Sequence, residues 1–108
     1  MAINYKNYAV SNIGTVATTV YNPTTSGIQS TIIGLNMANT SAFSITASVT
    51  LTSGATTVYL VKDAEIPKSN SLNIVSEGKI VVEANDVIQV VSSTASSVDV
   101  LVSVVEVA

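Results

Sequence analysis

Apolar and polar residues alternate along the chain with a period of two. The clearest example is residues 43–51, where every odd position is apolar and every even position is serine or threonine. Successive side chains of a β-strand point to opposite faces, so this pattern predicts a strand with one face on a core and one toward water. No segment of useful length repeats apolar residues at the helical spacing. The pattern therefore predicts an all-β fold.

Turn residues divide the chain into about eight to nine such segments. Ser53-Gly54 predicts a hairpin between residues 43–51 and 56–62, and Glu77-Gly78 predicts another tight turn. The expected strands are residues 5–10, 15–21, 29–37, 43–51, 56–62, 72–75, 79–83, 86–92 and 98–107. Short strands at this spacing are typical of an antiparallel β-sandwich or jelly roll. We expect residues 1–108 to form a single domain of this kind.

The last predicted strand is apolar on both faces. Four valines occupy one face, at positions 98, 100, 102 and 104, while Leu101, Val105 and Val107 occupy the other. Such a strand is either central in the sandwich or covered on its second side by another element. Because the chain carries little charge, we favour covering by another chain.

The first twelve residues have two interpretations. Apolar and aromatic residues, including Tyr5 and Tyr8, alternate there with asparagines. The segment is either an ordinary first strand or an N-terminal arm that pairs with the sheet edge of a neighbour. Aromatic residues are favoured at protein interfaces, although tyrosines also cap core edges. The residues predicted to contact other chains are Tyr5, Tyr8, Leu101, Val105 and Val107.

Charge and composition narrow the possible functions. Charged residues make up 10% of the chain, with four lysines, no arginine and a net charge of −3, which argues against nucleic-acid binding. Histidine and cysteine are absent, so the chain offers no imidazole base, no thiolate nucleophile and no usual zinc site. Polar residues interrupt each apolar run well before the roughly 18 residues of a membrane-spanning helix. We expect a protein without enzymatic activity, cofactor or membrane contact.

Two carboxylate pairs are the remaining chemical candidates. Asp63 with Glu65, and Glu83 with Asp86, could bind a hard cation such as Ca²⁺ or act as an acid and a base. Each pair flanks a predicted strand end, where charged residues usually face water. We therefore predict solvated loop residues and assign no metal-binding or catalytic residue. Asn39-Thr40-Ser41 matches the glycosylation acceptor pattern, but we expect it to form a turn.

Several segments together resemble small virion proteins of tailed bacteriophages. They are residues 18–23 (TTVYNP), 32–40 (IIGLNMANT), 45–49 (ITASV), 57–67 (TVYLVKDAEIP), 82–90 (VEANDVIQV) and 96–100 (SSVDV). These segments are patterns of strands and turns without catalytic signatures. The resemblance spans roughly residues 15 to 107 and carries over no functional residue.

The resemblance implies a structural component of the virion, assembled in the host cytoplasm. The leading hypothesis is a capsid decoration (cement) protein that stabilises the head by binding major capsid subunits. It implies a homo-oligomer, with a trimer favoured. One alternative is a neck, tail or fibre-associated subunit. Another is a carbohydrate-binding β-sandwich module for host attachment, for which Tyr59 near Asp63 is the only candidate platform.

Overall fold

The part of the chain that the structure describes folds into nine β-strands. The computed structural model describes residues 3–75 and 79–107, and these contain no helix. The strands are β1 (Ile3–Ile13), β2 (Thr18–Tyr21), β3 (Gln29–Asn39), β4 (Ile45–Ser53), β5 (Thr56–Ile66), β6 (Ser71–Asn73), β7 (Ile80–Val82), β8 (Val87–Ser92) and β9 (Val98–Val107). None of these residues lies in a helix of the length and apolar character that a membrane crossing requires.

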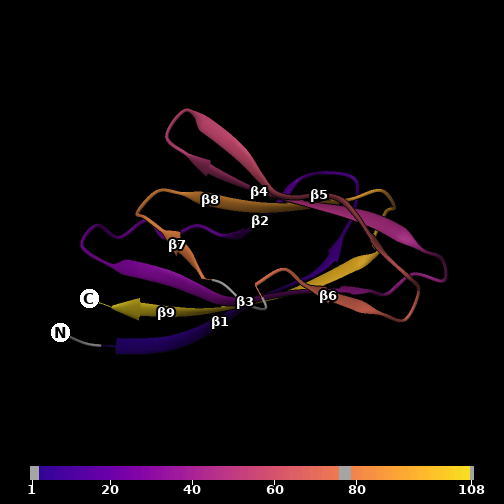
Figure 1. The fold of residues 1–108 in the computed structure, drawn as a ribbon, viewed down its shortest axis with the longest axis horizontal. Helices are drawn as coiled ribbons and strands as arrows, with labels where there is room; N and C mark the ends of the chain where they lie inside the picture. The colour runs from indigo at the N-terminus through magenta and orange to yellow at the C-terminus, as the bar shows by residue number, and fades with distance from the viewer. Residues whose placement is uncertain (1–2, 76–78, 108) are drawn as a thin grey trace.

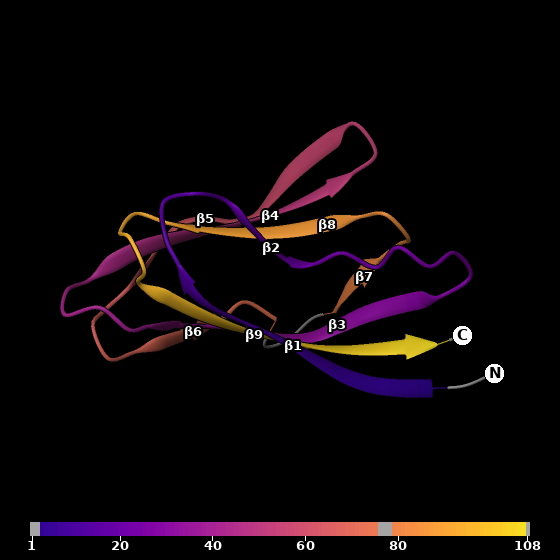
Figure 2. The ribbon, with the colours of Figure 1, turned by 180° about the vertical axis from the view of Figure 1, so that it is seen from behind.

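The strands form two antiparallel sheets that pack as layers (Figures 1 and 2). Sheet A has the order β1-β9-β3-β6, with β7 also paired to β3, and sheet B has the order β2-β8-β4-β5. Because β6 and β7 pair with different parts of β3, they share one strand position and leave four positions in each sheet. Eight positions, with the chain crossing repeatedly between the layers, form a jelly roll. The predicted fold class is confirmed.

The observed strands differ from the predicted ones mainly at their ends. The last strand has the predicted bounds, whereas β4 begins at Ile45 and leaves Phe43 in the preceding loop with 77% of its surface exposed. The Ser41 hydroxyl donates to the Phe43 carbonyl and accepts from its amide, so side-chain bonds take the place of strand pairing there. The other predicted turn, Glu77-Gly78, lies between β6 and β7. Both strands pair antiparallel to β3 and therefore run in the same direction, so they do not form a hairpin with each other. Glu77 and Gly78 themselves lie outside the described residues.

The predicted hairpin is confirmed. A two-residue turn, Gly54-Ala55, joins β4 to β5, and Gly54 has a φ of 62°. Glycine adopts this angle without steric cost, as a tight hairpin turn requires. The first twelve residues are largely accounted for by β1, which begins at Ile3 and pairs with β9 of the same chain. From Ile3 onward this segment is therefore a strand of the chain's own sheet.

The hydrophobic core lies between the two sheets. Sheet A contributes the four predicted valines of β9, which are at most 3% exposed. Sheet B contributes the fully buried Val49, Ile88 and Val90. Burying one such side chain stabilises the fold by about 1.5–3 kcal/mol. The period-two pattern of β4 therefore identified its core-facing side correctly from Ile45 to Val49.

The two faces of β4 predict opposite responses to the same substitution. Val49→Asp places a carboxylate in the core without a partner and should lower the free energy of unfolding by on the order of 3–5 kcal/mol. Thr50→Asp changes the outer face of sheet B, between Gln89 and Tyr59, and should cost about 1 kcal/mol or less. Urea unfolding followed by circular dichroism measures both values. Equal losses would contradict the assignment of the faces.

Candidate functional site

The outer face of sheet A gathers most of the residues predicted to contact other chains. The register of β1 against β9 pairs Tyr5 with Val105, and Ala9 with Leu101. Residues paired across two strands point to the same side of the sheet, and the alternation in β9 turns these away from the buried valines. Val107 lies on the same face, opposite Ile3. The structure therefore brings Tyr5, Leu101, Val105 and Val107 together.

This outer face is partly apolar and largely uncovered. Tyr5 is 77% exposed and Leu101 44% exposed, while Val105 and Val107 are half-buried among their strand neighbours. Ile33 and Val81 add exposed apolar surface from β3 and β7. Among the described residues, no third layer packs on this side of the sandwich. The last strand is thus central within its sheet, yet its second face is open.

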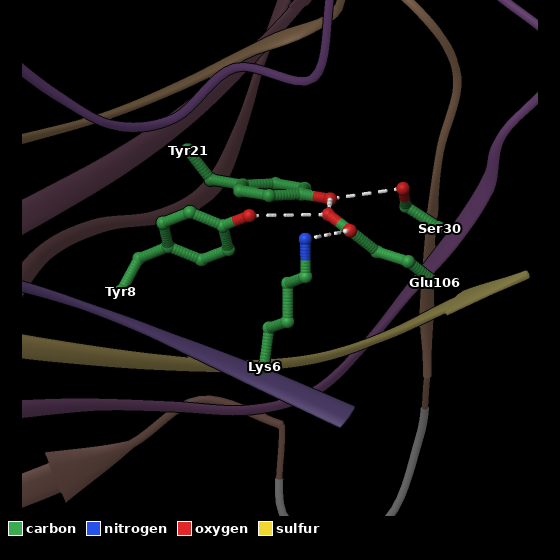
Figure 3. A network of polar contacts seen from close by, with 5 residues as sticks. All are labelled: Lys6, Tyr8, Tyr21, Ser30 and Glu106. Atoms are coloured by element: carbon green, nitrogen blue, oxygen red, sulfur yellow. Dashed lines mark hydrogen bonds and ion pairs between the residues drawn. The ribbon is translucent and has the colours of Figure 1, made fainter. Parts of the chain in front are cut away.

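Tyr8 does not belong to this surface. It lies on the inward side of β1, where its hydroxyl donates to Glu106 Oε2 at 3.2 Å. The buried Tyr21, from β2 of the opposite sheet, donates to the same oxygen at 2.7 Å and hydrogen-bonds with Ser30 Oγ at 2.9 Å. Lys6 Nζ lies 3.3 Å from Glu106 Oε1 (Figure 3). The network joins both sheets around one carboxylate.

The contacts within the network favour an ionised Glu106 and protonated tyrosines. The hydrogen bond from Tyr21, assisted by Lys6, lowers the pKa of Glu106 below its ordinary value although burial opposes this. Burial is the main cause that raises the pKa of Tyr21 and of Tyr8, and the nearby carboxylate raises both further. At neutral pH the carboxylate is therefore ionised and both phenols are protonated. The two phenols therefore donate hydrogen bonds to the buried Glu106 carboxylate, and these bonds connect β1 and β2 to β9.

The prediction that the two carboxylate pairs are solvated loop residues is wrong in part, because Asp63 and Glu65 lie within β5 and Asp86 is buried. Asp86 is buried, and its Oδ2 accepts from the Glu83 amide at 2.9 Å, which closes the turn before β8. The Asp63 amide donates to Ser48 Oγ at 2.9 Å, at a φ of 51°, where β5 bends. Residues 3–75 and 79–107 contain no group of three or more acidic, histidine or cysteine side chains placed to hold a metal ion.

Two smaller sequence signals also have structural explanations. Asn39 is 5% exposed, and its amide nitrogen donates to the carbonyls of Phe43 and Ile66 at 2.8 Å each. The side chain that a glycan would need is thus engaged in these bonds at the end of β3. Lys62 Nζ lies 5.2 Å from the centre of the Tyr59 ring. The ammonium therefore lies over one face of the only aromatic platform proposed for a sugar.

Comparison with known proteins gives a fold neighbour. No protein-family model and no curated protein sequence matches the chain. One solved structure has a similar fold and comes from work on Bacillus endospore appendages, described as a novel family of disulfide-linked pili. The likeness covers 96% of this chain and 86% of that chain, with a TM-score of 0.55 and 11% sequence identity. At that identity the likeness supports the fold.

Sequence reasoning missed Glu106, although a signal was present. Glu106 has the same parity as the four core-facing valines of β9, so the alternation places its carboxylate inside. A carboxylate on a core-facing position needs partners, because burying an unpaired charge is costly. Those partners, Lys6 and Tyr8 of β1 and Tyr21 of β2, are far from Glu106 in the sequence, and no local pattern connects them to it.

Glu106 should make stability depend on pH in the acidic range. Its pKa in the folded state lies below the ordinary value of 4.5, so its stabilising contribution is present above that pH and lost as the pH falls through the folded pKa. Glu106→Gln should lower the free energy of unfolding by about 1–2 kcal/mol at pH 7 and flatten its decline toward pH 3. Urea titrations at several pH values measure this effect. Glu65→Gln, at an exposed position of β5, is the control and should leave the profile unchanged.

Proposed function

We propose that this chain is a non-enzymatic structural subunit that assembles with other protein chains through the outer face of sheet A. The observation that carries the proposal is the set of Tyr5, Leu101, Val105 and Val107 on one uncovered face. The core between the sheets is complete without them. Tyr5, Val105 and Val107 are neighbours on this face, and the pair of Asn7 and Ser103 separates them from Leu101. Exposed apolar patches outside a complete core are characteristic of interaction sites.

The low charge of the chain supports this proposal. Of the residues on the outer sides of β1 and β9, only Asp99 is charged. Charged residues are depleted in the centre of protein interfaces, whereas tyrosine is enriched there. A surface of this composition is suited to burial against another protein.

The fold neighbour supports a structural role by analogy. A chain described as part of pili has the same layered architecture. Fold likeness alone does not transfer function, so the outer face remains the main support. The neighbour is described as disulfide-linked, whereas these 108 residues contain no cysteine. Any contacts made by this segment therefore rest on packing and hydrogen bonds.

The finer proposal is a virion decoration protein that binds major capsid subunits as a homo-oligomer. It rests on the resemblance to phage virion proteins, and a jelly roll without catalytic groups suits that role. The second candidate is a subunit of a fibre or appendage, which the likeness to a pilus chain favours. Electron microscopy of the purified protein distinguishes the candidates. Filaments would favour the fibre, and discrete oligomers that bind capsid shells would favour the decoration protein.

Assembly should depend on the outer face of sheet A. Val105→Asp introduces a charge at the centre of this face and should weaken self-association by roughly tenfold or more, as measured by sedimentation velocity. Val87→Asp makes the same change on the outer face of sheet B and should leave association unchanged. A chain that is monomeric at all concentrations and binds no capsid or fibre component would contradict the proposal.

A further inference from the structure

The exposed edges of the two sheets differ in how well they could accept another strand. Backbone groups at a sheet edge form a template for pairing with another chain, and proteins usually block such edges. In sheet A, β6 and β7 have three residues each. In sheet B, β2 has four residues and an irregular register, while β5 carries irregularities, a residue with positive φ at Asp63 and further charges at Lys62 and Glu65. Each of these edges is short, bent or charged.

The edge formed by β1 lacks these obstacles. From Ile3 to Val10 it pairs with β9 in unbroken register, and no described residue pairs with its other side. Proline is absent, and Lys6 is the only charged residue of the strand. Glu106 neutralises that charge at 3.3 Å. A second strand could therefore approach without meeting unbalanced charge.

We propose that two copies of this chain pair antiparallel through β1, with the two-fold axis midway between their Asn7 residues, which lie opposite each other. We call this the axis through Asn7. The other edges are blocked, so the complementary open edge on a second copy is β1 itself. A contact of this kind uses the same surface on both copies. The inference rests on the proposed function, because it assumes a structural subunit that assembles, and it adds a contact at the edge of β1 to the one on the outer face of sheet A.

Charge and strand length select the register. Residues that face each other in an antiparallel pair must lie on the same side of the sheet, so the axis passes through a residue. An axis through Lys6 would place two ammonium groups opposite each other, which is destabilising. An axis through Tyr5 or Tyr8 would shorten the pairing. The axis through Asn7 pairs residues 4–10 of both copies and ends before the irregularity that follows Val10.

Side-chain shape at this register is also complementary. The axis through Asn7 places Tyr5 of each copy opposite Ala9 of the other. Beside Ala9, the outer face has an open hollow of about 330 Å³, lined partly by Ala38, Asp99 and Leu101. Tyr5 is 77% exposed in the single chain and would lie across Ala9 toward Leu101. Each copy thus provides one projecting aromatic ring and one hollow, in positions that the two-fold axis exchanges.

Cysteine substitution tests the axis directly, because the chain has no cysteine of its own. Asn7→Cys places two thiols opposite each other within disulfide range, so diamide should oxidise them to a covalent dimer. Tyr5→Cys places its thiols on strand positions roughly 14 Å apart and should give little cross-link. Tyr59→Cys, exposed on β5, is the control for random collision. Cross-linking of Asn7→Cys no greater than that of Tyr59→Cys would overturn the proposal.

A reciprocal pair of substitutions tests the contact without cross-linking. Ala9→Glu puts a carboxylate against the opposing tyrosine and should raise the dimer dissociation constant by roughly tenfold or more. Adding Tyr5→Lys to the same chain places an ammonium opposite that carboxylate and should restore a large part of the affinity. Both positions are exposed, and unchanged thermal unfolding would verify the fold.

Sedimentation outcomes separate this inference from the proposed function. A dimer weakened by Ala9→Glu and restored by Tyr5→Lys supports pairing through β1. Oligomers that Val105→Asp disrupts and Ala9→Glu leaves intact would retain the proposed function and overturn the β1 contact. A chain that stays monomeric and binds no capsid or fibre component overturns both.

Discussion

The alternation of side chains along β9 is the constraint on which the rest of the structure depends. This strand lies between β1 and β3, so its backbone is paired on both sides and its register is held. With the backbone held, every second residue must point into the core and every other residue must point out. The inward valines form the centre of the sandwich. The outward residues, Leu101, Val105 and Val107, are consequently presented together on one open face.

The same constraint explains how much the sequence could predict. Where a local pattern decides the structure, as in residues 45–49 and in β9, the predicted faces are correct because alternation depends only on strand geometry. Phe43 extends the same pattern but lies outside the strand, since hydrogen bonds from Ser41 hold that loop. The alternation of apolar and polar residues does not show where a side chain, such as that of Ser41, takes the backbone hydrogen bonds that a strand would otherwise make.

The site around Glu106 shows a second limit of sequence reasoning. Parity places the carboxylate inside, but the partners that make this tolerable lie far from it in the sequence; Tyr8, for example, is 98 residues away. Tyr8 was expected at an interface because its residue type is common there. It instead faces inward, because its even position puts it on the opposite face of β1 from Tyr5, and it donates a hydrogen bond to the buried carboxylate. Tyr8 is therefore not part of the predicted surface, because it makes a contact with Glu106 that only the tertiary structure reveals.

The buried network and the open edge belong to the same strand, and this has a consequence for assembly. Lys6 and Tyr8 bind Glu106 from the inward side of β1, while Tyr5 and Ala9 lie on its outward side. The network holds β1 in register and thereby holds its outer side chains in fixed positions, which reduces the entropy lost on association. A two-fold contact through β1 closes on two copies, so larger assemblies need another surface. Ile33 and Val81 extend the apolar outer face toward β7, on the side of sheet A opposite β1. If both proposals hold, the open edge of β1 and the outer face of sheet A give the subunit two separate contacts, which is the minimum that a shell or fibre requires.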